Sequence, residues 1–146
     1  MPDVIASMLA NRRLEQVQPN PDHALSVLDM ARRHVRTAEM LADTADVEMA
    51  FTAAYDGARK ALTAVLALEG LRVRPVGGAH RNTGIAAAQF VTDEALGEFD
   101  WMRQVRNATE YPDDTRPPAS RADVREGIGA AGAIVDACAA HVRARA

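Results

Sequence analysis

Apolar residues recur at the spacing of an α-helix along most of this chain. The two clearest stretches cover 21–43 and 47–69, and their stripes are marked by Leu25, Leu28, Arg32, Val35, Ala38 and Leu41 in the first and by Phe51, Tyr55, Ala58, Leu62, Val65 and Leu66 in the second. Residues three and four positions apart share one face of a helix. We therefore expect two long amphipathic helices joined by a turn at 44–46.

Prolines and glycines mark where these helices begin and end. Asn20 is expected to cap the first helix, with Pro21 at its first position, and Gly70 is expected to follow the end of the second helix. A short helix over 1–17 is expected to precede them. It ends before Pro19 and Pro21, because proline disfavours helix at its own position and at the residue before it.

After a loop at 71–79, the pattern predicts three more helices, over 80–91, 93–111 and 121–143. Thr92 and Ser120 are the expected N-caps of the last two. The sequence shows no strand pattern and no internal repeat. The expected fold is all-α: an up-and-down four-helix bundle with one or two short accessory helices, in a single domain over 1–146 whose core covers about 21–143.

The composition is that of an ordinary globular protein. The 146 residues are 48% hydrophobic and 25% charged, and 17 Lys and Arg against 20 Asp and Glu give a formal net charge of −3. This balance excludes a strongly basic nucleic-acid binder that relies on bulk charge. A local basic patch stays open, formed by Arg72, Arg74 and Arg81 around the glycine pair at 77–78.

A single cysteine, Cys138, excludes an intramolecular disulfide and a multi-cysteine metal site. His141 follows it by one helical turn, but two side chains are too few for a metal site, so we expect neither a metal nor another cofactor. No apolar run approaches the ~20 residues that cross a bilayer, and the N-terminus lacks the basic start of a signal peptide. We expect a cytoplasmic protein that does not contact membranes.

The predicted helix over 93–111 carries the most informative residue. Arg106 falls inside its apolar arc, flanked in angular position by apolar side chains. A buried guanidinium is costly unless it is paired. Arg106 must therefore meet a carboxylate such as Asp56 or Glu110, a subunit interface, or the anion of a ligand.

The last predicted helix contains three glycines among alanines, Gly127, Gly129 and Gly132. An interior glycine costs a helix about 0.5–1 kcal/mol relative to alanine, so close packing must offset that loss. Two packing partners are open: another helix of the same chain, or a second subunit.

Three segments carry a family resemblance, AYDGARKALTAVLALEGLR at 54–72, GGAHRNTGIAAAQF at 77–90 and RNATEY at 106–111. In this order they are similar to the HEPN superfamily (higher eukaryotes and prokaryotes nucleotide-binding). The first resembles its long helix with a Tyr-x-x-Ala-Arg-Lys-Ala run, and the second resembles the segment that joins the two halves of the bundle. The third resembles the RNxxEY motif of small stand-alone actinobacterial members. The resemblance covers about 21–140.

The resemblance implies a homodimer in which two motifs face each other and cleave RNA without a metal. In catalytic members the motif arginine stabilises charge on the phosphate, and a histidine exchanges protons with the RNA. Arg106 and Asn107 match the first two motif positions, but Tyr111 stands where the histidine would come. An unperturbed tyrosine has a pKa near 10 and is a poor base at neutral pH, although it can donate a hydrogen bond or stack on a base. His80 is the candidate substitute, provided that the fold brings it near.

Three functions therefore stay open. The first is a homodimer that binds RNA or a nucleotide at a cleft around the motif, with degenerate or absent ribonuclease activity, through Arg103, Arg106, Asn107, Tyr111 and His80. The second is a metal-independent ribonuclease toxin whose antitoxin is a cognate nucleotidyltransferase, because the resemblance implies such pairs, in some of which the partner modifies a tyrosine near the motif. The third is a purely structural or interaction module, in which Arg106 forms a buried ion pair.

Overall fold

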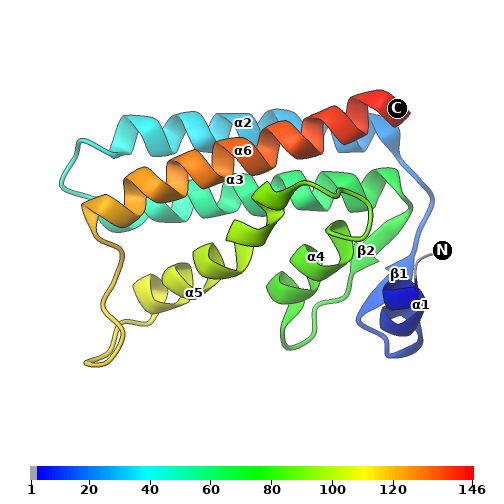
Figure 1. The fold of residues 1–146 in the computed structure, drawn as a ribbon, viewed down its shortest axis with the longest axis horizontal. Coiled ribbons are helices and arrows are strands. Elements are labelled where there is room, and N and C mark those ends of the chain that lie inside the picture. The colour runs from blue at the N-terminus through cyan, green and yellow to red at the C-terminus, as the bar shows by residue number, and fades with distance from the viewer. Residues whose placement is uncertain (1–2) are drawn as a thin grey trace.

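Four helices form the body of the protein. The computed structural model describes residues 3–146, in which α2 (Pro21–Leu41), α3 (Val47–Leu68) and α6 (Arg121–Arg145) lie side by side, with the shorter α5 (Phe99–Glu110) packed against α3 and α6 (Figure 1). In chain order the four helices run in alternating directions along the molecule. The expected all-α, up-and-down four-helix bundle is confirmed.

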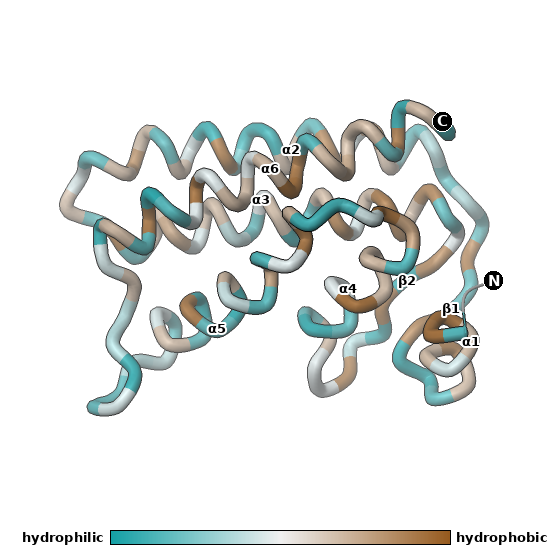
Figure 2. The backbone as a smooth tube through the Cα atoms, in the orientation of Figure 1, coloured by the Kyte–Doolittle hydropathy of each residue, from teal (hydrophilic) through white to brown (hydrophobic). Residues whose placement is uncertain are grey.

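Helix α3 is the centre of the bundle because it is apolar on nearly every side. It packs against α2, α4, α5 and α6, and its largest buried side chains are Phe51, Tyr55, Leu62 and Leu66. Along α2, by contrast, the hydrophilic positions lie mainly on the outer edge of the bundle (Figure 2). The close approach of α2 to α3 requires Gly57, where a Cβ would lie 2.9 Å from Val35 Cγ2 and 3.0 Å from the Ala31 carbonyl oxygen.

Two short strands were not expected from the sequence. β1 (Leu14–Gln16) pairs antiparallel with β2 (Leu71–Val73). The prediction of a helix over 1–17 was wrong, because α1 (Asp3–Ala10) ends before β1; the first two positions of that prediction lie outside the described residues. Strands of three residues are too short to show an alternating pattern, and each partner is distant in the sequence.

The capping residues expected for the long helices are confirmed. The Asn20 side chain accepts a hydrogen bond from the His23 amide at the start of α2 (3.0 Å). Ser120 begins α6 in a reciprocal capping box with Asp123. After α3, Gly70 has a φ of +77°, which favours glycine.

The segment before α5 differs from the prediction. Asp93, not Thr92, provides the cap, and it begins a 3₁₀ helix, η1 (Glu94–Glu98), so that α5 starts only at Phe99. A short α4 (Ala79–Ala87) precedes this segment and packs against α3 and α5. The stripe expected on α2 also differs at Leu25, which is 39% exposed because the buried face of α2 is built from Ala24, Val27, Leu28 and Ala31.

Packing within the chain explains one of the three glycines of α6. A Cβ at Gly127 would lie 2.8 Å from the Phe51 ring, whereas Gly129 and Gly132 face open space. A membrane-spanning helix, which would have to be both longer and more apolar than these, is not found between residues 3 and 146.

Candidate functional site

A buried tyrosine on α3 organises the polar groups between α3, α4 and α5. Tyr55 is fully buried, its ring stacks on Phe99 with centroids 5.3 Å apart, and the Arg106 guanidinium lies 5.9 Å from the ring centroid. The Tyr55 hydroxyl is 3.0 Å from Nδ1 of His80. Burial raises the pKa of Tyr55 to about 12, although Arg59 and Arg106 oppose the shift. The hydroxyl is therefore protonated at neutral pH and can donate to His80.

His80 lies in the first turn of α4 and is half-buried. Burial lowers the pKa of this histidine, and the positive charges of Arg59 and Arg106 lower it further. The imidazole is therefore neutral at neutral pH. When the Tyr55 hydroxyl donates to Nδ1, the ring proton is on Nε2, and that nitrogen becomes a donor.

Three arginines, Arg59, Arg103 and Arg106, surround this pair, and two of them have only distant counter-charges. Arg59 on α3 is 3.8 Å from Asp56, and Arg106 on α5 is 3.5 Å from Glu110. In the described part of the chain, Nε of both Arg59 and Arg106 is buried without a hydrogen-bond partner. An ion pair with Glu110, one of the alternatives open for Arg106, is thus found, but it leaves part of the guanidinium unsatisfied.

Arg103 is better paired. Its side chain donates two hydrogen bonds to the Asp100 carboxylate (2.8 and 3.1 Å), and Gln104 donates a third to the same carboxylate (2.8 Å). These bonds lower the pKa of Asp100 and hold Arg103 in place. Asp100 is itself exposed, so the pair is open to water and can exchange for another anion.

A hollow of about 310 Å³ lies between the start of α4 and α5, and we call it the α4–α5 hollow. It is lined by Gly78, Ala79, His80, Arg81, Arg103 and Asn107. The start of α4 has no side-chain cap and no acidic residue in its first turn. The Ala79 amide donates to the Val76 carbonyl oxygen (3.1 Å), and the next two amides of the first turn have no capping side chain. Arginines around an uncapped helix N-terminus favour an anion, above all a phosphate.

One known protein family matches most of this chain. A family profile described as HEPN domain matches residues 24–141, which is most of the chain. The chain belongs to the HEPN family. Searches of curated proteins and of solved structures returned no match. The matched range runs from the first turn of α2 to about one turn before the end of α6. It contains every residue of the α4–α5 hollow, whereas α1 and β1 precede it.

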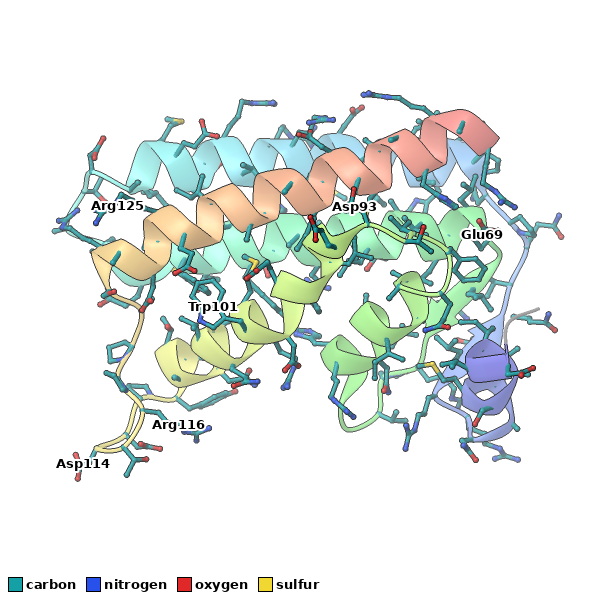
Figure 3. All side chains as sticks on the ribbon, in the orientation of Figure 1. Glu69, Asp93, Trp101, Asp114, Arg116 and Arg125 are labelled. Atoms are coloured by element: carbon teal, nitrogen blue, oxygen red, sulfur yellow. The ribbon has the colours of Figure 1, made fainter. Side chains whose placement is uncertain are left out.

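The structure brings together some of the expected HEPN site residues and separates others. His80, Arg103 and Asn107 line one hollow, and Arg106 lies beside them over the Tyr55 ring. Tyr111 follows the last residue of α5, is 70% exposed and does not line that hollow. It lies at the start of the loop that carries Asp114 and Arg116 away from the bundle (Figure 3).

Sequence reasoning placed Tyr55 on an apolar stripe and assigned no functional role to Tyr55 or Arg59, although both belong to the Tyr-x-x-Ala-Arg-Lys-Ala run. The available signal was their spacing of one helical turn, which places a hydroxyl and a guanidinium on the same face of an otherwise apolar helix. The basic patch expected around 77–78 is divided. Arg81 lines the α4–α5 hollow, while Arg72 and Arg74 line a different cavity.

Cys138 and His141 do not form a shared site. Cys138 is fully buried in the core, and burial raises the pKa of its thiol to about 12. His141 Nε2 is 2.8 Å from Oε2 of Glu69, which also pairs with Arg145 (3.2 Å). Figure 3 shows Glu69 near the end of α3, next to the last turns of α6. These residues tie the ends of two helices together.

Proposed function

We propose that this HEPN protein binds a phosphate group of RNA or of a nucleotide at the α4–α5 hollow. The observation that carries the proposal is the convergence of His80, Arg103 and Asn107 on the uncapped start of α4. Charge-assisted hydrogen bonds from a guanidinium and from backbone amides are the usual means of binding phosphate. Asn107 adds a side-chain amide that can hydrogen-bond a base or a ribose.

The local charge supports this proposal, although the protein as a whole is acidic. No aspartate or glutamate lines the α4–α5 hollow within residues 3–146, and Arg59 and Arg106 lie next to it around Tyr55. The net charge of −3 weakens attraction for long RNA at a distance, so we expect tight binding only where a phosphate reaches these arginines. In the homodimer that HEPN resemblance implies, two hollows would act on one strand.

A second candidate function is the metal-independent ribonuclease toxin, and the position of His80 favours it. This function needs the other tautomer of His80, in which Nδ1–H donates to the Tyr55 oxygen, so that Nε2 is free to take the proton of a ribose 2′-hydroxyl. The 2′-oxygen then attacks the neighbouring phosphorus, the bond from phosphorus to the 5′-oxygen breaks, and that oxygen takes a proton from water, which gives a cyclic phosphate and a 5′-hydroxyl end. His80 then returns its proton to the solvent. Arg103 and Arg106 would stabilise the charge that develops on the phosphate.

The toxin function also assigns a role to Tyr111. A tyrosine that a nucleotidyltransferase antitoxin modifies must be accessible, and the Tyr111 side chain is exposed on the loop beyond α5. A modification there would add a charged group near the end of α5, about two helical turns from Arg103.

Binding and cleavage are tested with a fluorescein-labelled single-stranded RNA in EDTA. We expect Arg103→Gln to weaken binding about tenfold, as the loss of one charge-assisted hydrogen bond does. Arg125→Gln is the matched control, because Arg125 is an exposed arginine on α6, well apart from α4 in Figure 3. If the native protein does not bind RNA or nucleoside phosphates at all, the structural module is the correct function.

The cleavage assay separates the two candidate functions. Cleavage by the native protein that disappears in His80→Asn, while binding is kept, establishes the ribonuclease. Binding without any cleavage leaves the phosphate-binding protein. Cleavage that survives in His80→Asn rules out His80 as the group that exchanges protons.

A further inference from the structure

A second and larger cavity lies beside the α4–α5 hollow, and we call it the β2–α3 cavity. Its volume is about 600 Å³, and its walls come from the C-terminal half of α3, from β2, from the start of α4 and from the chain between β1 and α2. This volume is in the range of pockets that enclose small molecules. His80 and Ala79 line both spaces.

One wall of the β2–α3 cavity is apolar. Leu66, Leu71, Val73 and Val17 line it, and the two threonines that also line it already donate their hydroxyl hydrogens to backbone carbonyl groups of α3 and α4. This wall therefore has little to offer a strongly hydrated ligand. It fits an aromatic or aliphatic body.

The rest of the lining contains three arginines, and two of them lack a close ion-pair partner. Arg59, Arg72 and Arg74 line the cavity, and none of the described residues in its walls is acidic. Arg72 is neutralised by Glu15 at 2.7 Å. Arg74 has no side-chain hydrogen bond or ion pair with any residue from 3 to 146, and its Nε is buried. Arg59 has only the 3.8 Å contact with Asp56.

Under-satisfied guanidinium groups in a half-buried wall call for an acceptor. A buried donor without a partner costs about 1–3 kcal/mol, so native proteins rarely keep one without compensation. An anion between Arg59 and Arg74 would supply both the acceptor oxygens and the negative charge. A guanidinium binds the oxygens of a planar carboxylate or of a tetrahedral phosphate.

We propose that the β2–α3 cavity binds a small organic anion, with its apolar body against Leu66 and Leu71 and its carboxylate or phosphate between Arg59 and Arg74. This inference goes beyond the proposed binding of RNA, because it concerns a separate cavity. A small molecule fits better than a nucleic-acid strand, since the apolar wall offers no positive charge along which a backbone of repeated phosphates would run.

The probe for this site is 8-anilinonaphthalene-1-sulfonate, an aromatic anion whose fluorescence increases in apolar surroundings. We expect the native protein to bind it, and we expect benzoate and phenyl phosphate to displace it at constant ionic strength. Comparison of these two competitors distinguishes a carboxylate ligand from a phosphate ligand. Benzamide, which is similar in shape to benzoate and uncharged, should displace the probe at least tenfold less well.

Variants locate the binding. Arg74→Gln should weaken benzoate or phenyl phosphate about tenfold, and Arg74→Lys should recover part of the loss because it keeps the charge. Arg103→Gln should change nothing here, because Arg103 lines only the α4–α5 hollow. Circular dichroism confirms that each variant is folded. The proposal is overturned if benzamide competes as well as benzoate, if the probe does not bind, or if Arg74→Gln binds like the native protein.

Discussion

Replacement of Tyr55 by phenylalanine removes one hydroxyl and tests whether Tyr55 holds His80. The ring stacked on Phe99 stays, and so does the apolar face below Arg106, because phenylalanine has the same shape. What is lost is the 3.0 Å hydrogen bond to His80 Nδ1. A hydrogen bond of this kind contributes about 0.5–1.5 kcal/mol to the free energy of unfolding. For a chain of this size that corresponds to a decrease of about 1–6 °C in the melting temperature.

The matched control is Tyr111→Phe, because Tyr111 is the only other tyrosine and is 70% exposed. Surface substitutions of this kind usually change stability by less than about 0.5 kcal/mol. Urea unfolding at neutral pH, followed by circular dichroism, measures both variants. Equal stability of Tyr55→Phe and the native protein, or an equal loss in both variants, would refute the hydrogen bond as a stabilising contact.

The control variant also gives a direct measurement of the buried hydroxyl. In Tyr111→Phe, Tyr55 is the only tyrosine left, and its ionisation followed by ultraviolet absorbance should have a midpoint at about 12. An unfolded tyrosine ionises near 10, so the free energy of unfolding should fall as the pH rises between these two values. A midpoint near 10 in the folded protein would show that water reaches the hydroxyl.

Three further measurements test other parts of the structure. Burial lowers the pKa of His80 in the folded protein below that of an unfolded histidine. The free energy of unfolding should therefore fall as the pH drops from about 7 through about 6.5. Urea unfolding at several pH values should show a smaller fall for His80→Asn. Gly127→Ala should lower the free energy of unfolding by about 1–3 kcal/mol, because the added Cβ would lie too close to the buried Phe51 ring, whereas Gly129→Ala should raise it by about 0.5–1 kcal/mol. A decrease in the free energy of unfolding for Gly129→Ala would indicate that a second subunit packs there. Size-exclusion chromatography at two protein concentrations would detect that subunit. Cys138 should react with a thiol reagent only after unfolding, because it is buried and its pKa is raised to about 12; a rapid reaction in the native state would contradict the packing of α6.

The parts of the fold that the sequence predicted are those determined by local chemistry. Helices α2, α3 and α6 have long apolar stripes, and their ends are fixed by residues whose effect is local, namely Asn20, Gly70 and Ser120. The strands and the 3₁₀ helix before α5 have no such signal. β1 exists because β2, far along the chain, supplies its hydrogen bonds, and Asp93 competes with its neighbour Thr92 for the same capping position.

Part of the candidate site could likewise be predicted from the sequence, and part could not. Arg103 and Asn107 are one helical turn apart, so their shared face follows from the spacing. The contact between Tyr55 and His80 joins residues 25 positions apart, and it depends on how α4 packs onto α3. Local spacing holds no information on that packing. The sequence also offered Tyr111 as a site residue, because local spacing holds no information on how far Tyr111 lies from the α4–α5 hollow. That distance is a property of the loop after α5.

The two proposed anion sites share His80, and both lie near the positive charge of Arg59, so binding at one site should affect binding at the other. His80 lines both spaces, and Arg59 lies on the wall of the β2–α3 cavity and close enough to His80 to lower its pKa. An anion in the cavity would neutralise Arg59, and that would reduce the positive potential at the α4–α5 hollow. We therefore expect saturating benzoate to weaken RNA binding, and Arg59→Gln to weaken both ligands.

Thermodynamic linkage makes this prediction strict. If benzoate lowers the affinity for RNA by some factor, RNA must lower the affinity for benzoate by the same factor. The measurement is RNA anisotropy with and without benzoate, at constant ionic strength, together with probe displacement by benzoate with and without RNA. If both ligands bind and neither affects the other, Arg59 does not couple the two spaces. If each excludes the other completely, they occupy one site, and Arg74→Gln and Arg103→Gln would then weaken both ligands alike.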